Sequence, residues 1–159
     1  MRARNLVVCI ALLAVSLLAG RAIGQAADPW IGTWKLNVAA SKYSPGPAPK
    51  SSTLMIAATS GGLKQTTDTV PATGAATHAE ITFNMDGKDY PVKGNPNVDT
   101  QSFKKIDARS YEVTAKKGGK VTTTTRVSYS ADGKARTATQ TGTTPDGKPL
   151  NNTLSYNRQ

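Results

Sequence analysis

The sequence predicts an all-β fold, an antiparallel up-and-down meander of about 8–10 strands that closes into a barrel. Asp-Gly-Lys recurs at residues 86–88, 132–134 and 146–148, and Asp-Gly supplies the positive φ angles that tight hairpin turns need. The segments between these turns are rich in Thr, Val and Tyr and alternate in polarity, with no 3.6-residue apolar repeat. A two-sheet β-sandwich is the alternative, although sandwiches usually need longer crossing connections.

The N-terminus has the pattern of a cleavable export signal. Arg2 and Arg4 make it positive, and residues 6–20 are uncharged and mostly apolar. This run is shorter than the roughly 20 residues that a membrane-spanning helix needs. Small residues then allow cleavage after Gly24 or Ala26. We therefore expect a periplasmic or secreted protein.

The length and charge of the mature chain indicate one basic domain. We expect a signal peptide at residues 1–26 and a single β-barrel domain at residues 27–159. The only cysteine, Cys9, lies in the signal, so the mature domain has no disulfide. Three of the 20 basic residues also lie there, which leaves 17 against 10 acidic residues and a net charge of +7. Such a charge favours weak attraction to anionic surfaces, or simply solubilises exposed strand faces.

The first strands follow the signal directly. A strand over residues 31–38 precedes a Pro-rich excursion at residues 39–52. Three prolines within five residues exclude a helix there and favour an extended segment, which packs along the barrel wall or covers one end. The next two strands are expected over residues 53–59 and 63–70, joined by a turn at Ser60-Gly61-Gly62.

Alternation assigns the faces of the later strands. Shorter strands are expected over 89–93 and 100–107. The predicted inward residues are Ile81, Phe83 and Met85 in strand 79–85; Tyr111, Val113 and Ala115 in strand 110–117; Val121, Thr123, Thr125, Val127 and Tyr129 in strand 120–129; and Leu150, Asn152, Leu154, Tyr156 and Arg158 in the last strand. Inward Thr123, Thr125, Thr137 and Thr139 would give a semi-polar interior; otherwise these threonines face solvent.

The residue types needed for common catalytic sites are scarce. His78 is the only histidine, which is too few for a zinc site, and no Gly-x-Ser-x-Gly elbow is present. Three of the ten carboxylates sit in the Asp-Gly-Lys turns, and Glu80 and Glu112 fall on outward faces. Phosphate-binding glycine loops are also absent. We expect a non-catalytic protein with no cofactor, no metal and no specific nucleic-acid partner.

A motif in the first strand and an arginine in the last strand indicate how one end of the barrel is closed. Gly32-x-Trp34 opens the first strand, and Arg158, in phase with Tyr156, lies on the last strand. In these features the chain resembles the calycin group, the lipocalins and fatty-acid-binding proteins. The resemblance implies a calycin-like barrel in which Gly32, Trp34 and Arg158 close one end, with the arginine stacked on the tryptophan ring. The chain lacks the helices found in those two families.

A second resemblance covers nearly the whole mature chain. Residues 32–37 (Gly-Thr-Trp-Lys-Leu-Asn), 41–47 (Ser-Lys-Tyr-Ser-Pro-Gly-Pro) and 89–96 (Asp-Tyr-Pro-Val-Lys-Gly-Asn-Pro) are similar to a family of small exported bacterial proteins of uncharacterised function. This likeness implies a periplasmic or secreted setting and no particular activity.

Two functions follow from these features. The leading one is a monomeric barrel that binds a small apolar or amphipathic ligand, and the candidate lining residues are Ile56, Ile81, Phe83, Tyr111, Val113, Val127 and Tyr129; the alternative is that they form an ordinary core. The second function is a basic, envelope-associated protein that binds an anionic polymer or membrane surface, and it would use Lys104, Lys105, Lys116, Lys117 and Lys120.

Overall fold

The computed structural model describes residues 28–159. The predicted signal peptide, with Cys9, lies outside the described residues. Ten strands and no helix are found in the described part. They are β1 (Gly32–Leu36), β2 (Ser51–Thr59), β3 (Gly62–Val70), β4 (Thr77–Phe83), β5 (Asp86–Pro91), β6 (Thr100–Lys105), β7 (Ser110–Lys117), β8 (Lys120–Tyr129), β9 (Ala135–Thr143) and β10 (Pro149–Arg158).

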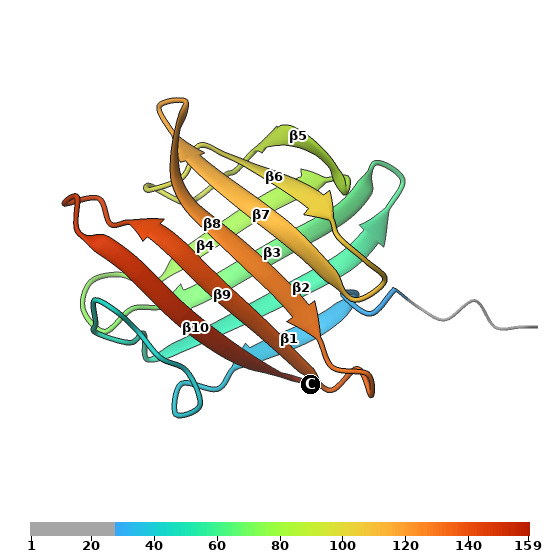
Figure 1. The fold of residues 1–159 in the computed structure, drawn as a ribbon, viewed down its shortest axis with the longest axis horizontal. Coiled ribbons are helices and arrows are strands. Elements are labelled where there is room, and N and C mark those ends of the chain that lie inside the picture. Colours follow the sequence, from blue (N-terminus) through green and yellow to red (C-terminus); the bar gives the residue numbers. More distant parts are fainter. Residues whose placement is uncertain (1–27) are drawn as a thin grey trace, which may run out of the picture.

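All ten strands belong to one antiparallel sheet that curls into a nearly closed barrel (Figure 1). Each strand pairs with its successor except β4 with β5, and β1 pairs with β10. The spatial order is therefore β4-β3-β2-β1-β10-β9-β8-β7-β6-β5. The predicted all-β meander is confirmed, and the two-sheet sandwich is not adopted.

Glycines at the predicted turns take up positive φ angles. Gly133 and Gly147 have φ values of +68° and +82°, and they lie in the β8–β9 and β9–β10 connections. Each sits in a position that only glycine adopts without strain. Residues 86–88 differ from the prediction, because Asp86 opens β5 and the turn falls just before it. The strand predicted over 89–93 accordingly runs from Asp86 to Pro91.

The Pro-rich excursion packs along the barrel wall. Lys42 and Thr153 exchange two backbone hydrogen bonds of 2.7 and 2.9 Å, and the amide of Asn151 donates to the carbonyl of Ser44 at 2.7 Å. Because β1 pairs with only the last residues of β10, this segment covers the remaining edge of β10. The excursion thereby completes the wall where β1 ends.

A bulge in β8 overturns one predicted side-chain direction. Ala115 pairs with Thr123, whereas Lys116 pairs with Val121, so one extra residue is inserted between the two pairs. Such a bulge reverses the side-chain phase beyond it. Val121 was predicted to face inward, but it points out and is 57% exposed. Thr125 stays on the inner side and is half-buried.

Strand β9 decides between the two orientations that the sequence leaves open for its threonines. Thr137 and Thr139 are exposed, because Ala138 and Arg136 occupy the inward positions of this strand. The interior therefore contains only part of the threonine set that alternation had suggested. Its semi-polar character comes from Thr125 and from other strands.

The two ends of the barrel differ in polarity. The end at which β1 begins is filled by buried aromatic rings; we call it the closed end, and its rings belong to Trp30, Trp34, Phe83, Phe103, Tyr111 and Tyr129. The opposite end, where β3 ends and β4 begins, carries half-buried polar side chains. We call this opposite end the mouth. Burial of the aromatic rings supplies most of the apolar core, since each removes a large area from water.

The gap between β4 and β5, which we call the seam, is bridged at one residue pair. Glu80 and Lys93 exchange two backbone hydrogen bonds, both of 2.9 Å. Near the closed end, Phe83 of β4 stacks on Phe103 of β6 with ring centroids 3.6 Å apart. The sheet is thus held across the seam by packing at one end and by one backbone bridge toward the other.

Candidate ligand-binding cavity

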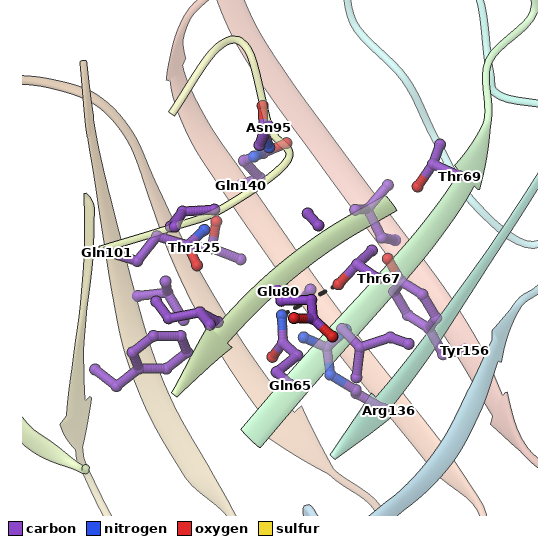
Figure 2. Close-up of a pocket in the computed structure, with 18 of the residues that line it drawn as sticks. Gln65, Thr67, Thr69, Glu80, Asn95, Gln101, Thr125, Arg136, Gln140 and Tyr156 are labelled. Carbon is purple, nitrogen blue, oxygen red and sulfur yellow. Dashed lines mark hydrogen bonds between the residues drawn. The ribbon is translucent and has the colours of Figure 1, made fainter. Parts of the chain in front are cut away.

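A cavity of about 230 Å³ lies inside the barrel between the aromatic closed end and the mouth. Figure 2 shows Arg136 and Tyr156 at one end of it, with Asn95, Gln140 and Thr69 at the other. Its wall also contains Leu54, Gln65, Thr67, Thr77, Ala79, Glu80, Ile81, Val92, Gln101, Phe103, Tyr111, Val113, Thr125, Ala138 and Leu154. The wall is therefore mixed, with apolar side chains beside amides, hydroxyls, one guanidinium and the acidic residue Glu80, whose carboxylate pairs with Lys64 at 2.8 Å.

Arg136 is the most unusual group in this wall. It is the second residue of β9, and its alternation with Ala138 turns both side chains inward. The residue is only 5% exposed. Its Nε and Nη1 atoms are buried without a hydrogen-bond partner. Among residues 28–159 it forms no salt bridge.

A buried guanidinium with two unpartnered nitrogens and no salt bridge is energetically unfavourable. It cannot shed its proton at physiological pH, and removing an ion from water costs several kcal/mol unless an opposite charge and hydrogen bonds compensate. Native proteins pair nearly all buried polar groups with protein or water. The open N–H groups of Arg136 therefore mark a place where an anion or a hydrogen-bond acceptor would be stabilised.

The surroundings of Arg136 are aromatic and uncharged. Its guanidinium carbon lies 4.7 Å from the ring centroid of Tyr156, a cation–π contact. Tyr111 and Tyr129 lie beside it on the closed-end side, with their hydroxyl oxygens 3.3 Å apart. Burial raises the pKa of Tyr129, so this phenol stays protonated and supplies no negative charge. The positive charge is left without a counter-ion within the barrel.

The structure separates the seven predicted lining residues into two groups. All seven are buried. Ile81, Tyr111 and Val113 line the cavity. Ile56, Phe83, Val127 and Tyr129 do not, and they belong to the packed core. The cavity also takes in residues that the sequence analysis did not single out, above all Arg136 and the glutamines and threonines toward the mouth.

A simple signal in the sequence marks the inward position of Arg136. In β9, threonines occupy positions 137, 139, 141 and 143, so one face of the strand is polar beyond Ala135, its first residue. The other face carries Arg136, Ala138 and Gln140. Ala138 is the apolar residue in the interior of the strand, and its burial shows which face is inside. If the inward face of β9 is assigned from Ala138 and not from the threonines, Arg136 is placed in the interior.

The three residues predicted to close the barrel lie together at the closed end. Trp34 is fully buried, and the guanidinium carbon of Arg158 lies 5.0 Å from its ring centroid. Arg158 also donates to the carbonyls of Ile31 and Gly133. Gly32 has a φ of +139°, and a Cβ there would come within 2.9 Å of Nη2 of Arg158, so a larger residue would strain the backbone and displace the arginine.

His78 and the five predicted surface lysines lie on the outside of the barrel. The Nδ1 atom of His78 is 2.6 Å from Asp68 on the neighbouring strand. No group of three or more potential metal-ligating side chains occurs within residues 28–159. Lys104 and Lys105 end β6, whereas the other three lysines flank the β7–β8 turn at the mouth; the five are Lys104, Lys105, Lys116, Lys117 and Lys120. They do not form one patch.

Two of these lysines are already neutralised by neighbouring carboxylates. Lys116 pairs with Asp89 and Lys117 with Asp99, each at 2.7 Å.

In the described part of the chain there is no helix of the length and hydropathy needed to cross a membrane. No protein-family model and no curated protein matches this chain. The cavity is therefore the feature of this protein that points to a function.

Proposed function

We propose that the protein is an exported, non-catalytic, calycin-like carrier that binds one small amphipathic molecule with an anionic head. The two unpartnered guanidinium nitrogens of Arg136, Nε and Nη1, in a residue of the cavity wall are the observation that carries this proposal. A carboxylate placed there would accept charge-assisted hydrogen bonds from the arginine, and these are stronger than bonds between neutral groups. The head would lie at the inner end of the cavity, against Tyr156.

The apolar part of such a ligand fits the middle of the cavity. Leu54, Ile81, Val113 and Leu154 provide apolar contacts there. A volume of about 230 Å³ falls just below the roughly 300–1,000 Å³ typical of drug-sized ligands. It equals the space of about eight water molecules at about 30 Å³ each. The ligand is therefore a short molecule, and any longer tail would extend into the mouth.

The charge of the whole domain favours the same class of ligand. Residues 28–159 carry 17 basic and 10 acidic side chains, a net charge of +7. A positive domain attracts small anions over distances of about one Debye length and raises their rate of association. Arg136 then supplies the specific contact within the barrel.

Binding of octanoate tests this function directly. We expect octanoate labelled with ¹³C at the carboxyl to bind one site per protein, as followed by NMR titration, and octylamine not to bind. In Arg136→Met the affinity should fall by about ten- to 100-fold, since hydrogen bonds to a charged group contribute about 1.5–3 kcal/mol.

The matched control is Arg126→Met. Arg126 lies on β8, next to β9, but it points to solvent and does not line the cavity. Its removal changes the net charge by the same amount and should leave octanoate affinity within about twofold. Equal losses in both variants would show that only the overall charge matters. The absence of octanoate binding to the unaltered protein would contradict the proposed function.

A further inference from the structure

The cavity approaches the outer surface of the barrel at the seam. Ile81 and Glu80 line the inner cavity, and the same two residues line a hollow on the outer surface together with Lys93. The cavity and the outer hollow therefore lie on the two sides of these residues. Every other neighbouring pair of strands is joined by at least three paired residues, whereas β4 meets the chain after β5 only through Glu80 and Lys93.

The segment that faces β4 across the seam is a compact loop, residues 92–99, which we call the flap. Val92 and Asn95 of the flap line the cavity. The amide of Val92 donates to the carbonyl of Asp99 at 2.8 Å, so the loop is closed at its base. Within it, the amide of Asn97 donates to the side chain of Asn95 at 2.9 Å. The flap thus has internal structure of its own.

The base of the flap is firmly attached to the β7–β8 turn. The amide of Asp99 donates to the carbonyl of Lys116 at 2.8 Å. The carboxylate of Asp99 accepts bonds from the Lys117 ammonium and the Gly118 amide, both at 2.7 Å. By contrast, the free side of the flap is joined to β4 by the two backbone bonds of Lys93. An anchored base and a lightly held free side are the requirements of a hinged element.

Gly94 sets how closely the flap approaches β4. Its φ is +75°, and a Cβ at this position would lie 2.0 Å from the carbonyl oxygen of His78. Only glycine permits this contact, since the obstructing atom belongs to the backbone of β4. The flap therefore lies directly against the strand that forms the other side of the seam.

We propose that the flap is a gate and that ligand enters and leaves the cavity through the seam when the Glu80–Lys93 bridge breaks. Opening requires the loss of two backbone hydrogen bonds, each worth about 0.5–1.5 kcal/mol net, while the ten-stranded sheet stays paired. Local openings of this size occur far more often than global unfolding. The gate rests on the proposed ligand-binding function for its purpose, but its motion is a property of the barrel alone.

A disulfide across the seam tests the gate. Glu80 and Lys93 exchange both of their backbone bonds, and Cα atoms in such pairs lie about 5.5 Å apart, within the range that a disulfide spans. Residues 28–159 contain no cysteine, so Glu80→Cys combined with Lys93→Cys forms a single pair. We expect oxidation to slow the exchange of ¹³C-octanoate by about tenfold or more relative to the reduced form of the same variant.

The matched control is a disulfide in a closed part of the wall. Thr124 and Thr141 are directly paired between β8 and β9, and both point away from the interior. Oxidation of Thr124→Cys combined with Thr141→Cys should leave octanoate exchange unchanged. If the seam disulfide also has no effect while octanoate still binds, ligand passes through the mouth, and the gate is wrong although the proposed function stands.

Amide hydrogen exchange tests the same motion without a ligand. We expect the amides of Glu80 and Lys93 to exchange at similar rates and about tenfold faster than the protected amides of the β9–β10 ladder. Protection equal to that of this ladder would overturn the gate. If octanoate binds to no form of the protein, the proposed function fails and this comparison alone decides whether the flap opens.

Discussion

Arg136 illustrates how one residue can be held in an environment that does not suit it. Its guanidinium is removed from water, and the groups around it are aromatic rings and the protonated phenol of Tyr129. The cation–π contact with Tyr156 returns about 0.5–2 kcal/mol, less than the several kcal/mol that effective desolvation of an ion costs. Ligand-binding sites commonly lower the stability of the ligand-free protein in this way.

Replacing this arginine should therefore stabilise the empty barrel. We expect Arg136→Met to raise the free energy of unfolding by about 1–3 kcal/mol, because methionine fills the space without a charge to desolvate. Urea unfolding of the ligand-free protein measures the change. A fall in stability would mean that the arginine is satisfied in the barrel, and the case for an anionic ligand would lose its support.

Gly94 and Gly87 allow backbone strain to be distinguished from steric contact, because their φ angles are nearly the same and their surroundings differ. Gly94 and Gly87 have φ values of +75° and +77°, but only Gly94 has an atom close to its missing Cβ. Gly94→Ala should therefore speed hydrogen exchange at Glu80 and Lys93, whereas Gly87→Ala should cost about 1 kcal/mol of strain without affecting those amides. Equal exchange in the two variants would show that Gly94 does not set the seam.

Residue-level predictability depended on alternation and failed where alternation was interrupted. Ile81, Tyr111 and Val113 could be placed inside from their strand pattern, and they line the cavity. Val121 could not, because the bulge in β8 depends on its pairing with β7 and leaves no clear mark in β8 itself. The environment of Arg136 was equally hidden, since it results from side chains on three strands.

At the scale of elements, the hairpins follow from local chemistry and the seam does not. Asp-Gly and Gly-Gly pairs specify where the chain turns, and the strands on either side of Gly118, Gly133 and Gly147 pair as neighbours. Asp86-Gly87 is also an Asp-Gly pair, yet it lies at the start of β5, and β5 does not pair with β4. Whether strands stay paired beyond a turn is decided by barrel closure, which is a non-local constraint.

The β3–β4 hairpin carries a titratable pair on its outer face. A hydrogen bond that His78 donates to the carboxylate of Asp68 raises the pKa of His78 above 6.5, with a further contribution from Glu80, whose carboxylate also pairs with Lys64. A raised histidine pKa stabilises the fold fully below the unfolded value, near 6.5, and the contribution is lost as pH rises through the folded value.

An NMR titration of the only histidine checks this pair. We expect the His78 ring signals to titrate with a midpoint above 6.5 in the unaltered protein. Asp68→Asn should lower that midpoint, because it removes the largest of the interactions that raise the pKa. High salt should reduce the shift, since both side chains are exposed. A midpoint unaffected by Asp68→Asn would exclude the pair in solution.

For the whole molecule, polarity changes along the barrel axis. Aromatic rings fill the closed end, Arg136 lies where this filling stops, and amides and hydroxyls continue to the mouth. Most of the aromatic core thus lies toward one end of the barrel, and most of the polar part of the proposed binding cavity lies toward the other. The fold class was predictable from turns and alternation, whereas this division was not, because it arises only when all ten strands are brought together.

Substitutions at the two ends should separate these roles. Phe103→Ala removes a ring that stacks on Phe83 and should lower the free energy of unfolding by about 3–5 kcal/mol. Thr125→Ala, which is in the cavity wall on the mouth side, should lower it by less than about 1 kcal/mol. Urea unfolding of both variants provides the comparison. Similar losses would contradict the assignment of stability to the closed end.

The pairing of β1 with β10 places the first and last strands side by side within the wall. A circular permutant that begins at β5, joins Gln159 to Asp28 through a short linker and ends at β4 would have its ten strands in spatial order. The barrel is therefore topologically a single ribbon rolled until its two long edges meet at the seam. In the natural order Asn84 and Met85 connect β4 to β5 at one end of the seam. The backbone bridge between Glu80 and Lys93 joins the two edges again further along.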